Sequence, residues 1–412
     1  DVAIFQPAFT SDGRSIVYVS DESGIGRLVL RDLKTGAVRS VGLDGGDLGV
    51  PAWIQGRRTF GLAGATRAVV AANSGGFVKL HVADFETGEL QPVESGYTSF
   101  DQPSVNPRTG LVAAIASSST VPPRIVVVPE SGGGDVVVQR SMSENIPAAA
   151  LAVAEPYSWP TVDGSTVHGL YFAPASDAFE SPGLPPLVVL VHGGPTSQVV
   201  AGWNAQAQFL ATRGYAVLAV NYRGSTGYGR DYMNALRNNW GVCDVEDSVT
   251  GAEALARDGR IDPARTAIMG GSAGGFTVLQ TMITHPEAFS VGVCMYGVAN
   301  QFTLAAETHK FEERYGDSLI GPLPDAAVAY RERSPQFRAS EIRRPIAIFQ
   351  GEIDEVVPKN QSDVIVAALQ RNGTPHEYHV YAGEGHGWRK AETIDAFYRA
   401  VERFLNQYLV YS

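Results

Sequence analysis

The sequence predicts an α/β protein, in which a mostly parallel, doubly wound sheet follows part of an all-β propeller. Three observations support this fold class. Residues 1–145 read as short strands separated by turn signals. Residues 146–412 alternate strands with helices, and the pattern changes near Glu155. Within the first part, similar motifs recur at intervals of about 40–50 residues, which is the length of one propeller blade.

The recurring motifs mark equivalent places in successive blades. The repeated strand openings are Pro7-Ala8-Phe9, Pro51-Ala52-Trp53 and Pro103-Ser104-Val105. A later turn recurs as Asp32–Gly36 and Asp84–Gly88, with a degenerate copy at Pro129–Gly132. A β-sandwich with accidental similarity between its turns is the alternative. We favour blades because both the period and the turn position recur.

Three blades cannot close a ring of four to eight, and an open array would leave strand edges exposed. We therefore expect further blades outside this chain, on an upstream segment of the same gene product. The chain begins at Asp1 rather than at Met. We accordingly expect a processed, cleaved or truncated product.

Composition excludes several classes of protein. Asp and Glu number 43 against 32 Lys and Arg, and the net charge of −11 argues against a general nucleic-acid binder. No stretch approaches the roughly 18 apolar residues of a membrane helix. The two cysteines, Cys243 and Cys294, form neither a disulfide framework nor a Cys-rich metal site. We expect a cytoplasmic protein without metal or cofactor, and a homo-oligomer is compatible with the sequence.

The second part opens with a hairpin, Tyr157–Pro160 and Val167–Tyr171, around a turn at Asp163-Gly164. The apolar strands expected after it are Leu187–Val191, Ala216–Val220, Thr266–Met269, Val291–Tyr296 and Ile346–Gln350. Helices are expected between them, among others at Val245–Asp258, Gly275–Thr284 and Asn360–Gln370. Such alternation predicts a parallel sheet covered by helices on both faces, with ligands bound at the carboxyl ends of its strands.

Ser272 is the candidate nucleophile. The strand Thr266–Met269 runs into Gly270-Gly271-Ser272-Ala273-Gly274-Gly275 and then into a helix. A lone G-x-S-x-G motif is weak evidence, but between a strand and a helix it describes a nucleophile elbow. Glycines on both sides allow the strained turn, and the helix N-terminus points its N–H groups at a developing oxyanion.

The partners of Ser272 should follow in the order acid, then histidine. Asp354 comes just after the strand Ile346–Gln350, whereas Asp317, Asp325, Asp363 and Asp395 read as solvated surface. His386 lies in a glycine-flanked loop after the last strand, Glu377–Tyr381. The other histidines after Ser272 are His285, His309, His376 and His379. We predict that His386 takes the Ser272 proton, that Asp354 orients the imidazole, and that water hydrolyses the acyl-enzyme.

An oxyanion needs two N–H donors. The backbone of Ala273 supplies one, and the loop His192-Gly193-Gly194-Pro195 after an early strand supplies the other, for which we choose Gly194.

These residues resemble the prolyl oligopeptidase family of serine peptidases, and most of all its acylaminoacyl-peptidase branch. The matching stretches are His192–Pro195, Asn221–Gly229, Trp240-Gly241, Asp244–Asp247, Gly270–Gly275, Ser334-Pro335, Gly351–Asp354 and Glu384–Gly387. The resemblance implies an α/β-hydrolase domain and a propeller that caps the active site and excludes folded proteins. It also implies a specificity pocket walled by Val298, Phe302 and Val357.

The sequence departs from the family pattern at two positions within the site. His192 stands where prolyl-specific members carry a tyrosine that completes the oxyanion hole, which favours two backbone donors. Ala273 stands where many members carry an aromatic residue, which should widen the site. The acidic residues with which dipeptidyl-peptidase members grip a free amine lie in a part of the propeller that this chain lacks.

We therefore expect a serine peptidase that hydrolyses short peptides or N-terminal aminoacyl or acylaminoacyl groups. The alternative is an esterase or amidase for a specific aminoacyl small molecule, such as an antibiotic. A catalytically silent propeller scaffold is a third hypothesis, against which the intact set of Ser272, Asp354 and His386 argues.

Overall fold

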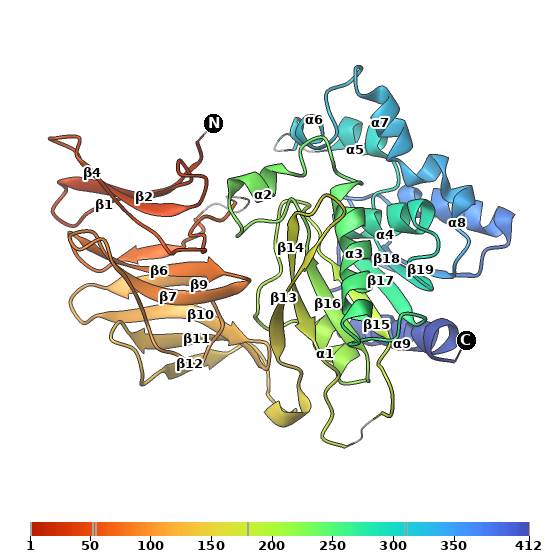
Figure 1. Cartoon of the computed structure of the whole chain (residues 1–412), viewed down its shortest axis with the longest axis horizontal. Coiled ribbons are helices and arrows are strands. Elements are labelled where there is room, and N and C mark those ends of the chain that lie inside the picture. Colours follow the sequence, from red (N-terminus) through yellow and green to blue (C-terminus); the bar gives the residue numbers. More distant parts are fainter. Residues whose placement is uncertain are drawn as a thin grey trace.

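A computed structural model describes every residue except 1, 52, 54, 55, 179, 180, 309, 311 and 412. Figure 1 shows a β-rich blade region beside a larger part that mixes helices and strands. The blade region ends with β12 at Arg140, and the C-terminal part begins with β13 at Ala154. The boundary expected near residue 145 falls between these two strands. No helix in the described ranges is long and apolar enough to cross a membrane.

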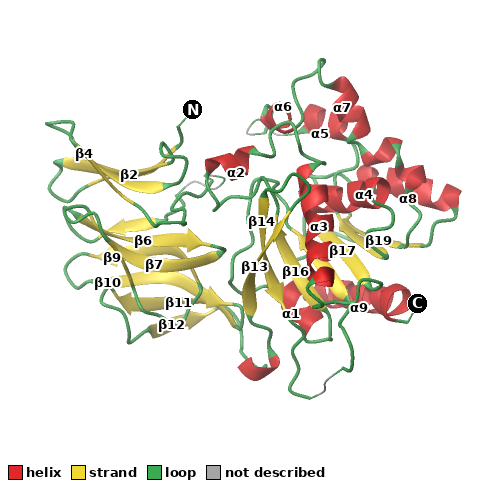
Figure 2. Cartoon of the chain, viewed as in Figure 1, coloured by secondary structure: helices red, strands yellow, loops and turns green. Residues whose placement is uncertain are grey.

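The strands described in the blade region form three consecutive units of four, each an antiparallel meander (Figure 2). The first unit is β1 (Ile4–Phe9), β2 (Ser15–Ser20), β3 (Arg27–Asp32) and β4 (Val38–Val41). The second is β5 (Phe60–Leu62), β6 (Arg67–Ser74), β7 (Phe77–Asp84) and β8 (Leu90–Pro92). The third is β9 (Ser99–Asn106), β10 (Leu111–Ser118), β11 (Val121–Pro129) and β12 (Val136–Arg140). The last two units meet through one parallel pair between β7 and β9.

The repeated turn motif occupies the same place in each unit, between its third and fourth strands. Asp32 Oδ1 accepts hydrogen bonds from the backbone N–H groups of Lys34 and Thr35, and Asp84 Oδ1 does the same for Glu86 and Thr87. Gly36 and Gly88 close these turns with φ of 74° and 77°, which glycine adopts without strain.

The strand openings recur less regularly than the turns. Pro7 lies in β1 and Pro103 lies in β9. The motif at Pro51 includes Ala52, which lies outside the described residues, and β5 begins only at Phe60. Among the described residues, no strand lies between the motif at Pro51 and β5, where the sequence pattern suggested one.

The C-terminal part is built on one sheet in the order β13-β14-β16-β15-β17-β18-β19-β20. The first two strands pair antiparallel, β14 also pairs antiparallel with β16, and every later pair is parallel. The strands are β13 (Ala154–Pro160), β14 (Thr166–Phe172), β15 (Leu187–Val191), β16 (Ala216–Asn221), β17 (Thr266–Gly271), β18 (Val291–Met295), β19 (Ile346–Gly351) and β20 (His376–Tyr381). The sheet is thus mixed but mostly parallel, as the sequence predicted.

Helices cover both faces of this sheet (Figure 1). One face packs against α3 (Cys243–Arg257), α4 (Ala273–Thr284) and α8 (Asn360–Asn372), and the other against α1 (Ala205–Ala211) and α9 (Ala391–Leu405). Alternate residues of β15 point into the two cores: Val189 joins the first and Val188 the second. This period of two is the reason why a continuous apolar run reads as a strand buried on both sides.

Four short helices lie apart from these layers. Three of them, α5 (Gln301–Glu307), α6 (Tyr315–Leu319) and α7 (Ala327–Glu332), form an excursion between β18 and β19 at the carboxyl edge of the sheet. The fourth, α2 (Arg230–Asn234), lies beside the blade region in Figure 1. These helices bring side chains from outside the sheet to the edge where ligands are expected.

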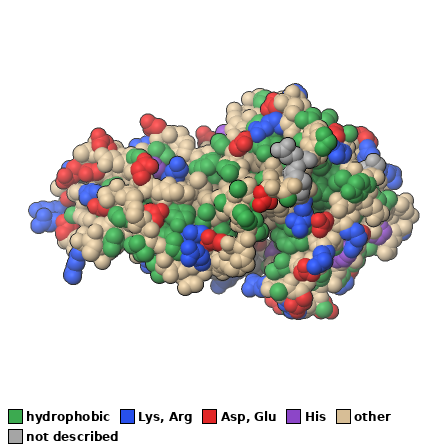
Figure 3. Space-filling model, turned by 90° about the horizontal axis from the view of Figure 1, so that it is seen from below, with side chains coloured by type: hydrophobic (Ala, Val, Ile, Leu, Met, Phe, Trp, Pro, Cys, Tyr) green, Lys and Arg blue, Asp and Glu red, His purple; other side chains and the backbone are tan. Residues whose placement is uncertain are grey.

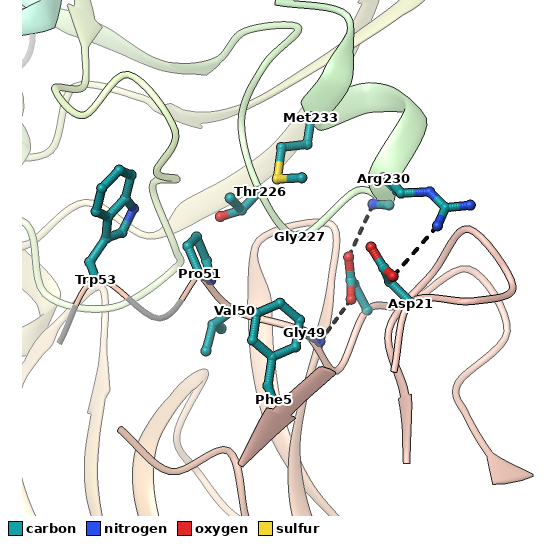
Figure 4. Close-up of a pocket in the computed structure, with 12 residues that line it drawn as sticks. Phe5, Asp21, Gly49, Val50, Pro51, Trp53, Thr226, Gly227, Arg230 and Met233 are labelled. Carbon is teal, nitrogen blue, oxygen red and sulfur yellow. Dashed lines mark hydrogen bonds and ion pairs between the residues drawn. The ribbon is translucent and has the colours of Figure 1, made fainter. Parts of the chain in front are cut away.

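One buried carboxylate joins the blade region to the C-terminal part. Asp47 accepts backbone hydrogen bonds from Gly26 and Gly49, and its second oxygen accepts one from Gly229 across the junction. Burial raises the pKa of this carboxyl group. Beside it, an ion pair of 3.5 Å between Asp21 and Arg230 crosses the same junction and borders a cavity of about 370 Å³ (Figure 4).

Candidate active site

Ser272 lies at the turn between β17 and α4 with φ 58° and ψ −123°, a conformation that non-glycine residues rarely adopt. Its backbone N–H donates to Met295 O at 3.0 Å, which ties the turn to β18. The neighbouring glycines are required by space. A Cβ on Gly270 would lie 2.5 Å from Gly274 O, and one on Gly275 would lie 2.7 Å from Gly297 Cα. The motif therefore folds as the elbow that its sequence predicted.

The expected acid and base lie together. His386 Nδ1 is 2.8 Å from Asp354 Oδ2, and the Asp354 side chain is fully buried. The other carboxylate oxygen, Oδ1, accepts the backbone N–H groups of Val356 and Val357, each at 2.9 Å. These bonds fix the carboxylate, so the ring bonded to it has one orientation. The geometry assigns Nδ1 as the proton donor and leaves Nε2 facing away from Asp354.

The His386 loop is held by polar and aromatic contacts. Glu384 is buried, and its carboxylate accepts the backbone N–H groups of Arg389 and Lys390, which precede α9. The Tyr296 ring lies 4.5 Å from the His386 ring, centroid to centroid. Ser272 and His386 line one cavity, although no hydrogen bond joins the Ser272 hydroxyl to the imidazole. Such bonds are often long until substrate is bound.

The loop after β15 lies against the elbow. A Cβ on Gly193 would lie 3.1 Å from Gly271 O and 3.4 Å from Ser272 Cβ. His192 Nδ1 is 2.8 Å from Gly193 O, so Nδ1 must carry the proton, and Nε2 then accepts the Ser225 hydroxyl at 2.8 Å. Burial lowers the pKa of His192 to about 4, which keeps the ring neutral.

This histidine has a consequence for the next residue. In a trans peptide the C=O and the N–H point in opposite directions. By holding Gly193 O, His192 fixes the direction of the N–H of Gly194, which points the opposite way within the same peptide plane. The sequence suggested His192 only as a departure from the family pattern, because its hydrogen bonds depend on Ser225, 33 residues away.

A cavity of about 80 Å³, here called the α5 cavity, opens between Ser272 and the excursion. It is largely apolar, and its walls include Val298 and Val357, both of which the sequence suggested. Phe302 does not line it: its ring packs instead on Tyr330 and Phe337, at 5.3 and 6.3 Å. The lining residues are Gly194, Pro195, Trp240, Ser272, Ala273, Val298, Gln301, Leu304, Ala305, Thr308, Glu312, Tyr315, Gly316, Leu319, Tyr330, Val356 and Val357.

The position of Phe302 follows from helix geometry. Gln301, Leu304, Ala305 and Thr308 line the cavity, at the i, i+3, i+4, i+7 spacing of one helix face. Phe302 lies about 100° around that helix and faces the next layer. A helical pattern over 301–308 is the signal that would have identified the lining residues.

Most of the competing acids and histidines have other partners, and Asp325 is exposed. Asp317, Asp363 and Asp395 pair with Arg314, Lys359 and Arg399. His379 contacts Glu377 at 2.7 Å and stacks on Phe349. His285 ends α4, and His376 Nδ1 lies 2.7 Å from Thr374 O. His309 lies outside the described residues. Asp354 and His386 therefore form the acid–histidine pair beside Ser272.

Known proteins resemble this chain in sequence. A model of the prolyl oligopeptidase family matches residues 202–411. Dipeptidyl aminopeptidase BIII of Pseudoxanthomonas mexicana is 39% identical over 229 residues, which are 54% of this chain and 33% of that protein. The acylamino-acid-releasing enzyme of Sus scrofa is 33% identical over 224 residues, 52% of this chain and 30% of that enzyme. The chain spans about a third of the length of these relatives.

Solved structures extend the likeness to nearly the whole chain. A puromycin-hydrolyzing peptidase of Mycobacterium tuberculosis matches with a TM-score of 0.93 and 34% identity, over 99% of this chain and 63% of that one. A crystal structure of puromycin hydrolase gives 0.92 and 33%, over 98% and 61%. The family match covers the chain from α1 to the last helix, with the elbow and the acid–histidine pair inside it. The chain belongs to the prolyl oligopeptidase family.

Proposed function

We propose that this chain is the catalytic part of a serine peptidase that hydrolyses short peptides or N-terminal aminoacyl or acylaminoacyl groups. The observation that carries the proposal is the strained Ser272 in one cavity with a histidine already bonded to a buried aspartate. Strain at a polar residue on an elbow is retained where it serves chemistry. Membership of the family supports the same reaction.

In the proposed reaction, His386 Nε2 accepts the Ser272 proton while Oγ attacks the substrate carbonyl. The backbone N–H groups of Ala273 and Gly194 stabilise the oxyanion. His386 then gives the proton to the leaving amine as the C–N bond breaks. Water then attacks the Ser272 acyl-enzyme ester by the same steps and releases the carboxylic acid product. Asp354 stabilises the imidazolium whenever it forms.

The α5 cavity is the proposed pocket for the side chain of the residue that is acylated. Its walls from Val298, Leu304 and Val357 favour an apolar side chain, since burial of apolar surface is favourable at roughly 25 cal/mol per Å². Phe302 supports this pocket from behind, through Tyr330. An anionic side chain would lose hydration there without a countercharge, because the charged group among the described lining residues is the carboxylate of Glu312.

A second candidate function follows from two of the structural relatives, whose names state that they hydrolyse puromycin. The chain would then be an amidase for an aminoacyl small molecule of the antibiotic type. The catalytic groups are the same in both hypotheses, so only the preferred leaving group separates them.

Additional blades are the proposed partner of the blade region. The outer face of the third unit exposes apolar side chains on adjacent strands, namely Leu111, Ile115, Ile125, Val136 and Val138. Figure 3 shows apolar side chains among the exposed residues at the blade end. Such a sheet face is normally covered by another layer. The occupant we propose is an upstream part of the same gene product, and a second copy of the chain is the alternative. We also propose a cytoplasmic location, with which the two buried free thiols agree.

A panel of chromogenic amides tests the proposed activity. Free and N-acetylated derivatives of alanine, leucine and phenylalanine are compared with internal peptides, and purified protein is checked by intact mass for a co-purifying fragment. We expect hydrolysis of the short amides by wild type and none by Ser272→Ala. Cleavage of long internal peptides alone would contradict the end-group preference, and no hydrolysis at all would favour the silent scaffold.

A further inference from the structure

A second cavity also has Ser272 in its lining. It has a volume of about 410 Å³ and is here called the α1 cavity, because Gln206 from α1 forms part of its wall. The carboxyl ends of β15, β17 and β18 supply most of the remaining lining. Both cavities contain Ser272 and Gly194, but His386 lines only the α1 cavity.

We propose, on the basis of the proposed function, that the α1 cavity is the leaving-group subsite and that it selects uncharged, bulky amines. When the C–N bond of the tetrahedral intermediate breaks, the departing nitrogen must receive the proton that His386 took from Ser272. The leaving group must therefore lie on the His386 side of the serine. Of the two cavities that contain Ser272, only the α1 cavity meets this condition.

The residue before the nucleophile keeps the cavity open. Gly271 has no side chain, and a Cβ there would lie 2.9 Å from Tyr296 Cε2 and 3.1 Å from the Tyr296 hydroxyl. Gly193, which also lines the cavity, likewise adds no side chain to it. Tyr296, Met269 and Met295 also line the cavity, so that one aromatic and two flexible apolar residues border it. A planar or branched amine fits such a space.

The lining has no countercharge for a carboxylate. None of the described residues that line the cavity is Lys, Arg, Asp or Glu, and the imidazolium that His386 becomes during the reaction is already paired with Asp354. His192 is neutral because burial lowers its pKa to about 4, and burial raises the pKa of Tyr296 to about 12. A leaving amino acid with a free carboxylate would lose hydration there without a partner. Amides, arylamines and internal peptide bonds avoid this cost.

Gln206 is the polar group available to a neutral leaving group. Its Nε2 donates to Met295 Sδ at 3.6 Å, and thioether sulfur is a weak acceptor. A carbonyl or amide of the leaving group is a better partner, so the exchange favours binding. Gln206 is thus the proposed specificity-determining residue of this subsite.

The test uses two leaving groups that differ by one carboxylate: 4-nitroaniline and 5-amino-2-nitrobenzoate. Both are attached to the same acyl group, chosen as the one that wild type hydrolyses fastest among free and N-acetylated alanyl, leucyl and phenylalanyl. The measured quantity is the ratio of kcat/KM for the two substrates. Because kcat/KM reports only the steps up to the acyl-enzyme, deacylation does not enter the ratio.

Charge at position 206 should change this ratio in opposite directions. We expect Gln206→Lys to favour the carboxylated substrate by about 10-fold relative to wild type, and Gln206→Glu to disfavour it by a similar factor. Gln206→Met is the uncharged control of similar volume, and Val298→Ala in the α5 cavity should change both substrates equally. Dividing each ratio by that of wild type cancels intrinsic leaving-group reactivity.

The outcomes separate the subsite from the function. Shifts of at least five-fold in opposite directions support the proposal. Smaller shifts, or shifts of the same sign for Gln206→Lys and Gln206→Glu, overturn the subsite proposal. In that case hydrolysis by wild type still supports the proposed function. Absence of hydrolysis by wild type overturns both. Circular dichroism identifies a variant that fails to fold. If only one of the two charged variants folds, its kcat/KM ratio is compared with that of Gln206→Met, and a shift of at least five-fold in the expected direction is required.

Discussion

The blade region and the C-terminal part differ in where their polar side chains are used. In the C-terminal part, buried polar groups converge on one sheet edge, where His386 is hydrogen-bonded to Asp354 and lines one cavity with Ser272. In the blade region, the buried carboxylate of Asp47 bonds only to backbone N–H groups, one of them across the junction. The difference indicates that the C-terminal part supplies the chemistry and that the blade region fixes a loop beside it.

The loop in question is Arg223–Gly229, which follows β16. Its ends are held from both sides: Arg223 forms ion pairs with Glu246 and Asp247 within the C-terminal part, and Gly229 bonds to Asp47 of the blade region. Between these ends, Ser225 bonds to His192. The segment Arg223–Gly229 therefore connects the blade region to the loop His192–Pro195, which carries the proposed oxyanion donor. Mutations can weaken the contacts at either end of this segment.

The largest effect is expected at Ser272. Ser272→Ala removes the nucleophile, and kcat should fall by roughly 10⁶-fold, as in other serine hydrolases that lose a triad member. Stability should stay nearly unchanged, because the φ of 58° is strained for either residue. The fall in kcat is measured by steady-state hydrolysis of the chromogenic amide that wild type hydrolyses fastest. A loss below about 100-fold would mean that another group is the nucleophile.

Asp47→Ala tests the other side of the comparison. It leaves three backbone N–H groups at the junction without their acceptor, of which those of Gly26 and Gly229 are buried and that of Gly49 is partly buried. We expect a loss of unfolding free energy of roughly 3 kcal/mol in urea titrations, since each unsatisfied buried donor costs about 1–3 kcal/mol. The fall in kcat at a temperature where the variant is folded should stay below about 10-fold. Asp12→Ala, at an exposed turn, is the matched control.

His192→Ala lies between these extremes. Without the Nδ1 donor, Gly193 O is no longer held and the N–H of Gly194 loses its orientation. We expect kcat to fall by about 100-fold, which corresponds to the loss of one oxyanion donor, with KM nearly constant. If KM rises and kcat does not fall, His192 acts on substrate binding instead.

Asp244 gives a smaller, pH-dependent effect. It accepts hydrogen bonds from Gly241 N and the Thr277 hydroxyl beneath α4, and burial raises its pKa to about 6. Because the folded form binds this proton more tightly than the unfolded form, the contribution of Asp244 is greatest below about pH 4 and is lost as pH rises through about 6.

The variant Asp244→Asn removes this titration. Relative to wild type, its unfolding free energy should therefore increase between pH 5 and 7.5 by about 1.4 kcal/mol. Urea titrations of both proteins at several pH values provide the measurement. A difference that stays flat over this range would show that Asp244 titrates normally.

The sequence predicted those parts of the fold and site that depend on local patterns. The elbow, the sheet and the repeated turns at Asp32 and Asp84 each follow from a few adjacent residues, because backbone strain and strand period act locally. The order of the acid and the histidine after Ser272 also restricts the choice to a few positions.

Cavity walls were harder to predict because they depend on contacts between distant segments. Gln206 and Tyr296 meet across 90 residues of sequence, and neither belongs to a motif. Phe302 was expected in the pocket because its position matches a pocket-wall position of the resembled family, but the phase of α5 turns it toward Tyr330. Exposure of Leu111 and Ile115 likewise depends on what lies against the third unit, which no local pattern encodes.

The most direct test of the account is the site of covalent labelling by a fluorophosphonate. The chain is labelled at pH 8 as wild type, Ser272→Ala and His386→Ala, and digests are analysed by mass spectrometry. The account predicts a single adduct on Ser272 in wild type, none in Ser272→Ala, and labelling slowed by at least 100-fold in His386→Ala. An adduct on any other residue, or no adduct on wild type while a reference serine hydrolase is labelled, would contradict it.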